Sequence, residues 1–168
     1  MIDVVMATLR EEFSDVSDPA QITRIVSRLL LAGLLGGMLG YERERSGKAA
    51  GIRTHMLVAM GAALFVLVPQ QAGMVIGDIS RIAQGIVTGV GFLGAGAIIK
   101  HRMPEDVHGL TTAAGVWMTA AIGIACGLGR ESTALLSALL ALLVLSAVPH
   151  LLRKPDEPGG RNPADGNR

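Results

Sequence analysis

The residues best suited to chemistry gather in one polar stretch that follows a long apolar segment. The stretch offers carboxylate, guanidinium, hydroxyl and imidazole groups from Glu42, Arg43, Glu44, Gly51, Arg53, Thr54 and His55. Carboxylate oxygens suit hard cations such as Mg²⁺, whereas arginine and histidine recognise acidic groups of a partner. We therefore interpret the stretch as a candidate site for a cation or a protein partner. A charged collar at a membrane surface remains the alternative interpretation.

The apolar segments themselves contain only neutral polar side chains. No Asp or Glu lies deep within any of them, although ionisable residues inside a membrane usually mark an ion path. The neutral candidates for such a path are Gln84, Thr88, Thr111, Thr112 and Thr119. This pattern argues against a simple transporter, but it leaves a hydrated or carbonyl-lined path open.

Enzymatic and cofactor chemistry have little support. The GxGxxG match at Gly89–Gly94 lies inside an apolar segment, where a phosphate would lose its hydration, so it does not predict nucleotide binding. No nucleophile and base stand at a spacing typical of catalysis, and no basic aromatic stretch predicts nucleic-acid binding. The histidines His55, His101, His108 and His150 fall near one predicted surface with Glu105 and Asp106. They suit a divalent ion or a pH sensor, or are ordinary interfacial polar residues, so the metal ligands remain unknown.

The elements that must position these residues are membrane-spanning helices. Half of the 168 residues are hydrophobic, only 17% are charged, and the mean hydropathy is +0.47. Five apolar segments approach the roughly 20 residues that cross a bilayer, at positions 22–41, 56–77, 82–99, 110–128 and 134–152. The predicted fold is an all-α transmembrane bundle of about five helices.

Orientation follows from Lys and Arg in the short loops. Arg43, Arg45, Lys48 and Arg53 follow the first segment, and further basic residues follow the third and fifth, so that side is predicted to be cytoplasmic. The N-terminus is then outside and the C-terminus inside. Residues 1–21 are predicted to form an acidic extracytoplasmic segment, and residues 153–168 a disordered cytoplasmic tail.

Glycines at helical spacing predict closely packed helices. The packing candidates are Gly33, Gly36, Gly37, Gly40, Gly85, Gly89, Gly91, Gly94 and Gly96. GxxxG pairs among them would let a neighbouring helix of the bundle, or of a partner, approach closely. Shifting the sequence by 58 positions also aligns Gly33 with Gly91 and Thr54 with Thr112. This match suggests a parallel repeat in which the first two helices correspond to the third and fourth.

Several motifs in order resemble the MgtC/SapB family of membrane proteins. They are GGxxGxERE at Gly36–Glu44, AGIRTH at Ala50–His55, GxGFLGAGxI at Gly89–Ile98, GLTTAA at Gly109–Ala114, and Trp117. The resemblance runs from about residue 28 to 127. It implies a multi-pass protein of the bacterial inner membrane, tied to growth at low magnesium and, in pathogens, to survival inside host cells.

The resemblance also implies a mode of action. One member is described as restraining the F-type ATP synthase, so we expect a non-enzymatic regulator that acts on a membrane partner. The alternative is a Mg²⁺ transporter or channel. Longer members carry a soluble domain after the last helix, whereas only about fifteen polar residues follow Leu152 here, which indicates a short form. We expect a lipid bilayer as surroundings and no cofactor; self-association is left open.

Overall fold

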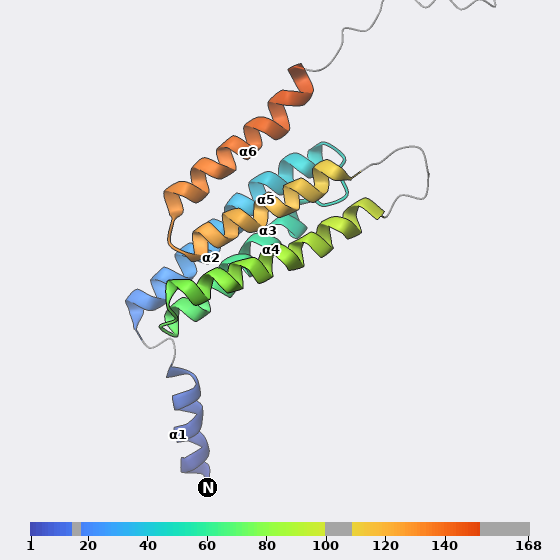
Figure 1. Ribbon diagram of the computed structural model, residues 1–168. Helices are drawn as coiled ribbons and strands as arrows, with labels where there is room; N and C mark the ends of the chain where they lie inside the picture. The colour runs from blue at the N-terminus through green and yellow to red at the C-terminus, as the bar shows by residue number, and fades with distance from the viewer. Residues whose placement is uncertain (15–17, 100–108, 152–168) are drawn as a thin grey trace, which may run out of the picture.

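The computed structural model describes residues 1–14, 18–99 and 109–151. Within these ranges the chain forms six helices and no strand, which confirms the all-α prediction (Figure 1). The helices are α1 (Ile2–Glu12), α2 (Pro19–Arg45), α3 (Ile52–Gln71), α4 (Ile76–Ile99), α5 (Leu110–Gly127) and α6 (Glu131–Leu151). All except α1 are long and apolar enough to cross a membrane, as predicted.

The α3 and α4 helices begin earlier than the second and third apolar segments indicate. The α3 helix covers Ile52–Gln71 rather than 56–77, because a turn with Gly73 at φ +77° ends it and lets α4 start at Ile76. Its N-cap is Gly51, which supplies no side-chain cap. The Glu44 carboxylate accepts the Ile52 amide at 3.0 Å and takes the place of a local cap.

The N-terminal segment contains a helix that its acidic composition does not predict. The apolar residues Ile2, Val5, Met6 and Leu9 of α1 and its C-cap Phe13 lie at helical spacing and are all exposed. This pattern is typical of a helix that lies on a membrane surface. The predicted tail at 153–168 lies outside the described residues.

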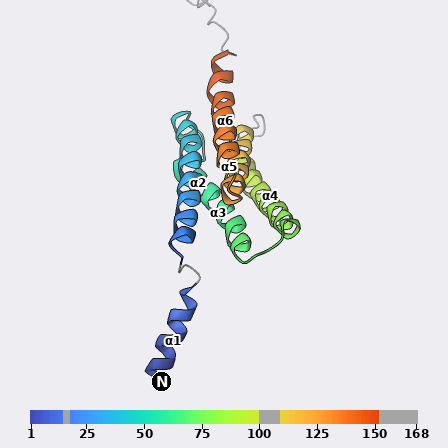
Figure 2. The same ribbon diagram turned by 90° about the vertical axis from the view of Figure 1, so that its left-hand side faces the viewer.

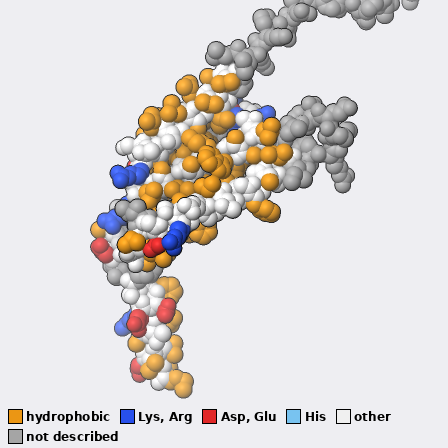
Figure 3. Space-filling model, viewed as in Figure 1, with side chains coloured by type: hydrophobic (Ala, Val, Ile, Leu, Met, Phe, Trp, Pro, Cys, Tyr) orange, Lys and Arg blue, Asp and Glu red, His pale blue; other side chains and the backbone are white. Residues whose placement is uncertain are grey.

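The α5 helix is the centre of the bundle. It packs against α2, α3, α4 and α6, and α2 also packs against α3 and α6. Figure 2 shows α4 at one edge of this arrangement. The main core cluster joins Leu35 and Leu39 of α2, Ala59 of α3, Ile122 of α5 and Ala134 of α6. Apolar side chains also cover much of the outer flank, as lipid requires (Figure 3).

Glycines bring the backbones of α2, α3 and α5 into contact. A Cβ on Gly36 would lie 2.6 Å from the His55 carbonyl oxygen, and one on Gly40 would lie 2.6 Å from the Ile52 Cα. On the other side of α3, a Cβ on Gly127 would lie 2.5 Å from the Ala63 carbonyl oxygen. The predicted packing role is thus supported for α2, where Gly33 and Gly37 also contact methionine side chains of α3.

Most α4 glycines have no such role within the chain. A Cβ on Gly85, Gly89, Gly91 or Gly96 would meet nothing within 4 Å, and only Gly94 approaches a neighbour, Ala113 at 3.4 Å. The expectation that these glycines hold the bundle is therefore wrong for all but Gly94. Their contact with a partner helix stays a prediction.

The helix contacts within the two hairpins, α2–α3 and α4–α5, correspond under the 58-residue shift. Gly36 faces His55 in the α2–α3 hairpin, and the equivalent Gly94 faces Ala113 in the α4–α5 hairpin. The α3 range 52–71 shifts to 110–129, which nearly coincides with α5. The two hairpins therefore share helix register as well as residues, as a repeat requires.

We predict that Gly36→Ala lowers stability by about 1–3 kcal/mol, because the new methyl group meets backbone that cannot move aside. Gly91→Ala is the matched control, since its methyl group meets nothing and alanine favours the helix. Thermal unfolding of the purified protein in detergent measures both. Equal midpoints for the two variants would show that the close backbone contact is dispensable.

Candidate functional site

A buried arginine lies at the end of α2 that is predicted to face the cytoplasm. Arg43 is 2% exposed, and its Nε donates to the Glu42 carboxylate. Its Nη2 donates to the Leu145 carbonyl of α6 at 3.4 Å, while Ser46 donates to the other Glu42 oxygen at 2.9 Å. The Glu42 carboxylate is thus the counterion that lets a permanent charge remain inside the bundle.

His55 lies beside this pair and is fully buried. Its Nδ1 is 3.0 Å from the Gly51 carbonyl oxygen, which can only accept, so Nδ1 carries the proton. The Nε2 atom is then an acceptor, and it has no hydrogen-bond partner among the described residues. A Cβ on Gly115 would lie 3.5 Å from Nε2 and 3.8 Å from Arg43 Cδ, so α5 leaves room for both side chains.

Two threonines of α5 continue this polar region. Thr112 is 2% exposed and lies one helical turn before Gly115, on the same face. Thr119 donates to the Gly115 carbonyl at 2.9 Å, so its own helix satisfies its hydroxyl group. We call Glu42, Arg43, His55 and Thr112 the inner cluster.

The structure separates the other predicted site residues from the inner cluster. Glu44 caps α3, and a Cβ on Gly51 would collide with its carboxylate, which explains the glycine. The remaining predicted residues are exposed on the outside of the bundle: Arg53, Thr54, Gln84, Thr111 and Trp117. Of the predicted residues Glu42, Glu44, Arg53 and His55, the structure places Glu42 near His55, while Glu44 caps α3 and Arg53 is exposed.

The arrangement offers little to a metal ion. No group of three His, Cys, Asp or Glu residues is close enough to hold one within residues 1–14, 18–99 and 109–151. The predicted grouping of His55, His101, His108 and His150 cannot be placed, because His101, His108 and the side chain of His150 lie outside the described part. In the inner cluster Glu42 already neutralises Arg43, and the one buried side-chain atom without a partner among the described residues is His55 Nε2, which suits a hydrogen-bond donor.

A second polar group, centred on Arg28, joins the helices at the end of the bundle opposite to the inner cluster. Its residues are not among the predicted site residues. Arg28 donates to the Gln70 side chain at 2.8 Å and to the Gly127 carbonyl at 2.9 Å, and it lies 3.8 Å from the Glu131 carboxylate. These bonds join α2, α3, α5 and the start of α6. In the sequence, the feature that could have indicated this group is Arg28 itself, a charged residue within the apolar segment 22–41.

We expect Glu42→Ala to destabilise the protein by about 3 kcal/mol or more, because Arg43 then lacks its counterion. Adding Arg43→Met should restore most of that loss, since the buried charge is removed with its partner. Glu44→Ala is the matched control, which loses only the α3 cap at a cost of about 1 kcal/mol. Thermal unfolding in detergent measures all three, and failure of the double variant to recover would contradict the pairing.

Similarity to known proteins covers most of the chain. Protein SrpB of Synechococcus elongatus is 47% identical over 138 residues, 75% of each chain. Putative magnesium transporter YhiD of Escherichia coli K12 is 43% identical over 136 residues, 75% of this chain and 61% of that protein. Protein MgtC of Salmonella typhimurium is 45% identical over 122 residues, 70% of this chain and 49% of that protein. No solved structure matches significantly.

The family-level match spans nearly all of the membrane region. The MgtC family pattern matches residues 29–154, which include the inner cluster and all five apolar helices except the start of α2. Together with the bacterial relatives, these helices indicate a multi-pass protein of the bacterial inner membrane. The chain belongs to the MgtC family.

Proposed function

We propose that this protein serves magnesium homeostasis as a non-enzymatic regulator that binds another membrane protein. The observation that carries the proposal is the distribution of polar groups across the five spans. The described interior between α2, α3 and α5 is apolar at mid-height, with Leu35, Ala59 and Ile122 in contact. Polar groups of the interior lie mainly at its two ends, around Arg43 and around Arg28.

The polar and aromatic candidates that remain point outward. Gln84 and Thr88 are exposed on α4, and Trp117 is half-exposed on α5. An exposed amide within a membrane span is costly in lipid and gains from a hydrogen bond to another helix. These residues are therefore candidates for contact with a membrane partner. The partner that the family resemblance implies is the F-type ATP synthase.

A second candidate function is Mg²⁺ transport, which the name of the YhiD relative suggests for that protein. A transport path through this bundle would have to pass the closely packed backbones at Gly36 and Gly127. This close packing disfavours the alternative.

Flux measurements separate the two functions. We expect liposomes that contain the purified protein and an entrapped Mg²⁺ dye to show the same Mg²⁺ entry as empty liposomes. Thr112→Ala and Gln84→Ala should leave that rate unchanged. Flux above background that either substitution reduces would overturn regulation in favour of transport.

Regulation is tested by adding a partner. We expect ATP-driven proton pumping by F-type ATP synthase to fall when this protein is reconstituted in the same liposomes. Gln84→Leu and Trp117→Ala should weaken that inhibition several-fold, because both change exposed contact candidates. Leu140→Ala, on the exposed face of α6, is the control and should keep it. Unchanged pumping at all protein ratios would exclude this partner.

A further inference from the structure

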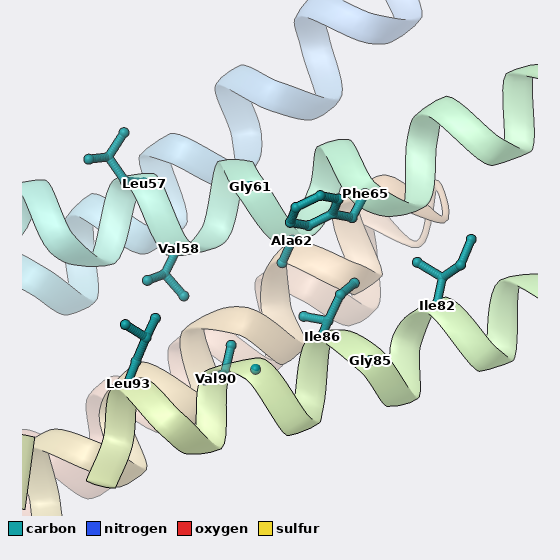
Figure 4. Close-up of a pocket in the computed structure, with 11 residues that line it drawn as sticks. Leu57, Val58, Gly61, Ala62, Phe65, Ile82, Gly85, Ile86, Val90 and Leu93 are labelled. Atoms are coloured by element: carbon teal, nitrogen blue, oxygen red, sulfur yellow. The ribbon is translucent and has the colours of Figure 1, made fainter. Parts of the chain in front are cut away.

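An open apolar groove of about 480 Å³ lies between α3 and α4. In Figure 4, Val58 and Ala62 of α3 point towards α4, while Ile86 and Val90 of α4 point towards α3. The groove runs along α4 from Ile82 to Leu93, about 17 Å by helix geometry. This length is more than half of a hydrocarbon core, which is enough for a helix to lie along it.

The α4 wall of the groove is built for close approach. Gly85 and Gly89 line it at GxxxG spacing, and a Cβ on either would meet nothing within 4 Å. The next turn presents Phe92, which is 82% exposed. No charged residue occurs between Ile82 and Ile99, so this face can meet another apolar helix without burying a charge.

The internal repeat indicates what kind of element fits there. The shift of 58 residues relates α2 to α4 and α3 to α5, so a helix packed on α2 and α5 corresponds to one packed on α4 and α3. In this chain α6 packs on α2 and α5. The second position is the groove, and the chain supplies no helix for it among the described residues.

The α2 residues at the α6 position correspond to the α4 residues that line the groove. Leu31, Ala32 and Leu35 of α2 belong to, or pack against, the core cluster that includes Ala134 and Ala138 of α6. Shifted by 58, they become Gly89, Val90 and Leu93, which line the groove. The surface that α6 covers in the first hairpin is therefore open in the second.

The direction in which the helices run limits which helix can occupy the groove between α3 and α4. Figure 1 shows that α2, α4 and α6 run the same way through the bundle, so a helix that takes the equivalent position runs parallel to α4. The α4 helix of a second copy meets this requirement when a two-fold axis stands along the membrane normal. Each α4 then lies in the groove of the other copy, with Gly85 and Gly89 close to the axis.

We propose that the protein forms a symmetric homodimer in which α4 of each copy occupies the groove between α3 and α4 of the other. The contact is self-complementary, because α4 both lines the groove and supplies the small-residue face that enters it. It buries Phe92 and Leu93, which are exposed in the single chain. This inference is independent of the proposed regulatory function.

Single-molecule photobleaching of singly labelled protein in dilute liposomes tests the dimer. We expect two bleaching steps for the unaltered protein and for Gly91→Leu. Gly89→Leu should give mainly one step, with a dimer roughly tenfold or more weaker, because leucine fills the contact. The Cβ of either leucine meets nothing within 4 Å in the single chain, and Gly91 is about 200° around the helix from Gly89. Thermal unfolding in detergent checks that both variants fold.

Cysteine crosslinking checks the same contact in native membranes. In a Cys126→Ala background, Gly85→Cys should give a disulfide-linked dimer under mild oxidation, whereas Leu140→Cys, exposed at similar depth on α6, should not. One-step bleaching of the unaltered protein would overturn the proposal and leave the groove to lipid or another protein. Equal weakening by Gly89→Leu and Gly91→Leu would overturn it as well.

Discussion

The contact of helix backbones at glycine is the constraint on which the rest of the structure depends. Gly36 lies against the His55 carbonyl and Gly127 against the Ala63 carbonyl, so α3 is held between α2 and α5 with direct backbone contact at these glycines. Lipid is as apolar as the helix surfaces, and close van der Waals packing therefore replaces the hydrophobic effect as the source of cohesion. The same closeness leaves a core of small and aliphatic side chains in the middle of the described interior.

That spacing also determines where charge can be buried. The inner cluster exists because Gly115 leaves room beside Arg43 and His55, and because Glu42 supplies a counterion from the same helix. Breaking such a pair is far more costly than never having it. Through its hydrogen bond to the Leu145 carbonyl, the buried arginine also links this end of α2 to α6.

The two hairpins share a pattern but not their surroundings. In the first hairpin α2 carries Glu42 and Arg43 and packs against α6, whereas in the second α4 presents open glycines, Gln84 and one wall of the apolar groove. His55 corresponds to Ala113, so the imidazole has no counterpart in the second copy of the repeat. The buried polar groups and the open apolar surface are therefore carried by different members of the equivalent pair α2 and α4.

The sequence by itself determined the five spans, the all-α class and the family, because hydropathy over 20 residues and ordered motifs are local properties. It also identified Arg43 and His55 as candidates, since they belong to a polar stretch whose side chains suit a cation or a protein partner. Only the tertiary structure decided that Thr112 lies in the buried cluster region while Arg53, Thr54 and Gln84 point outward. It also decided that Gly36 packs while Gly85 is open. Both outcomes depend on which face of a helix meets which neighbour, and apolar residues on every side of a membrane helix hide that choice from the sequence.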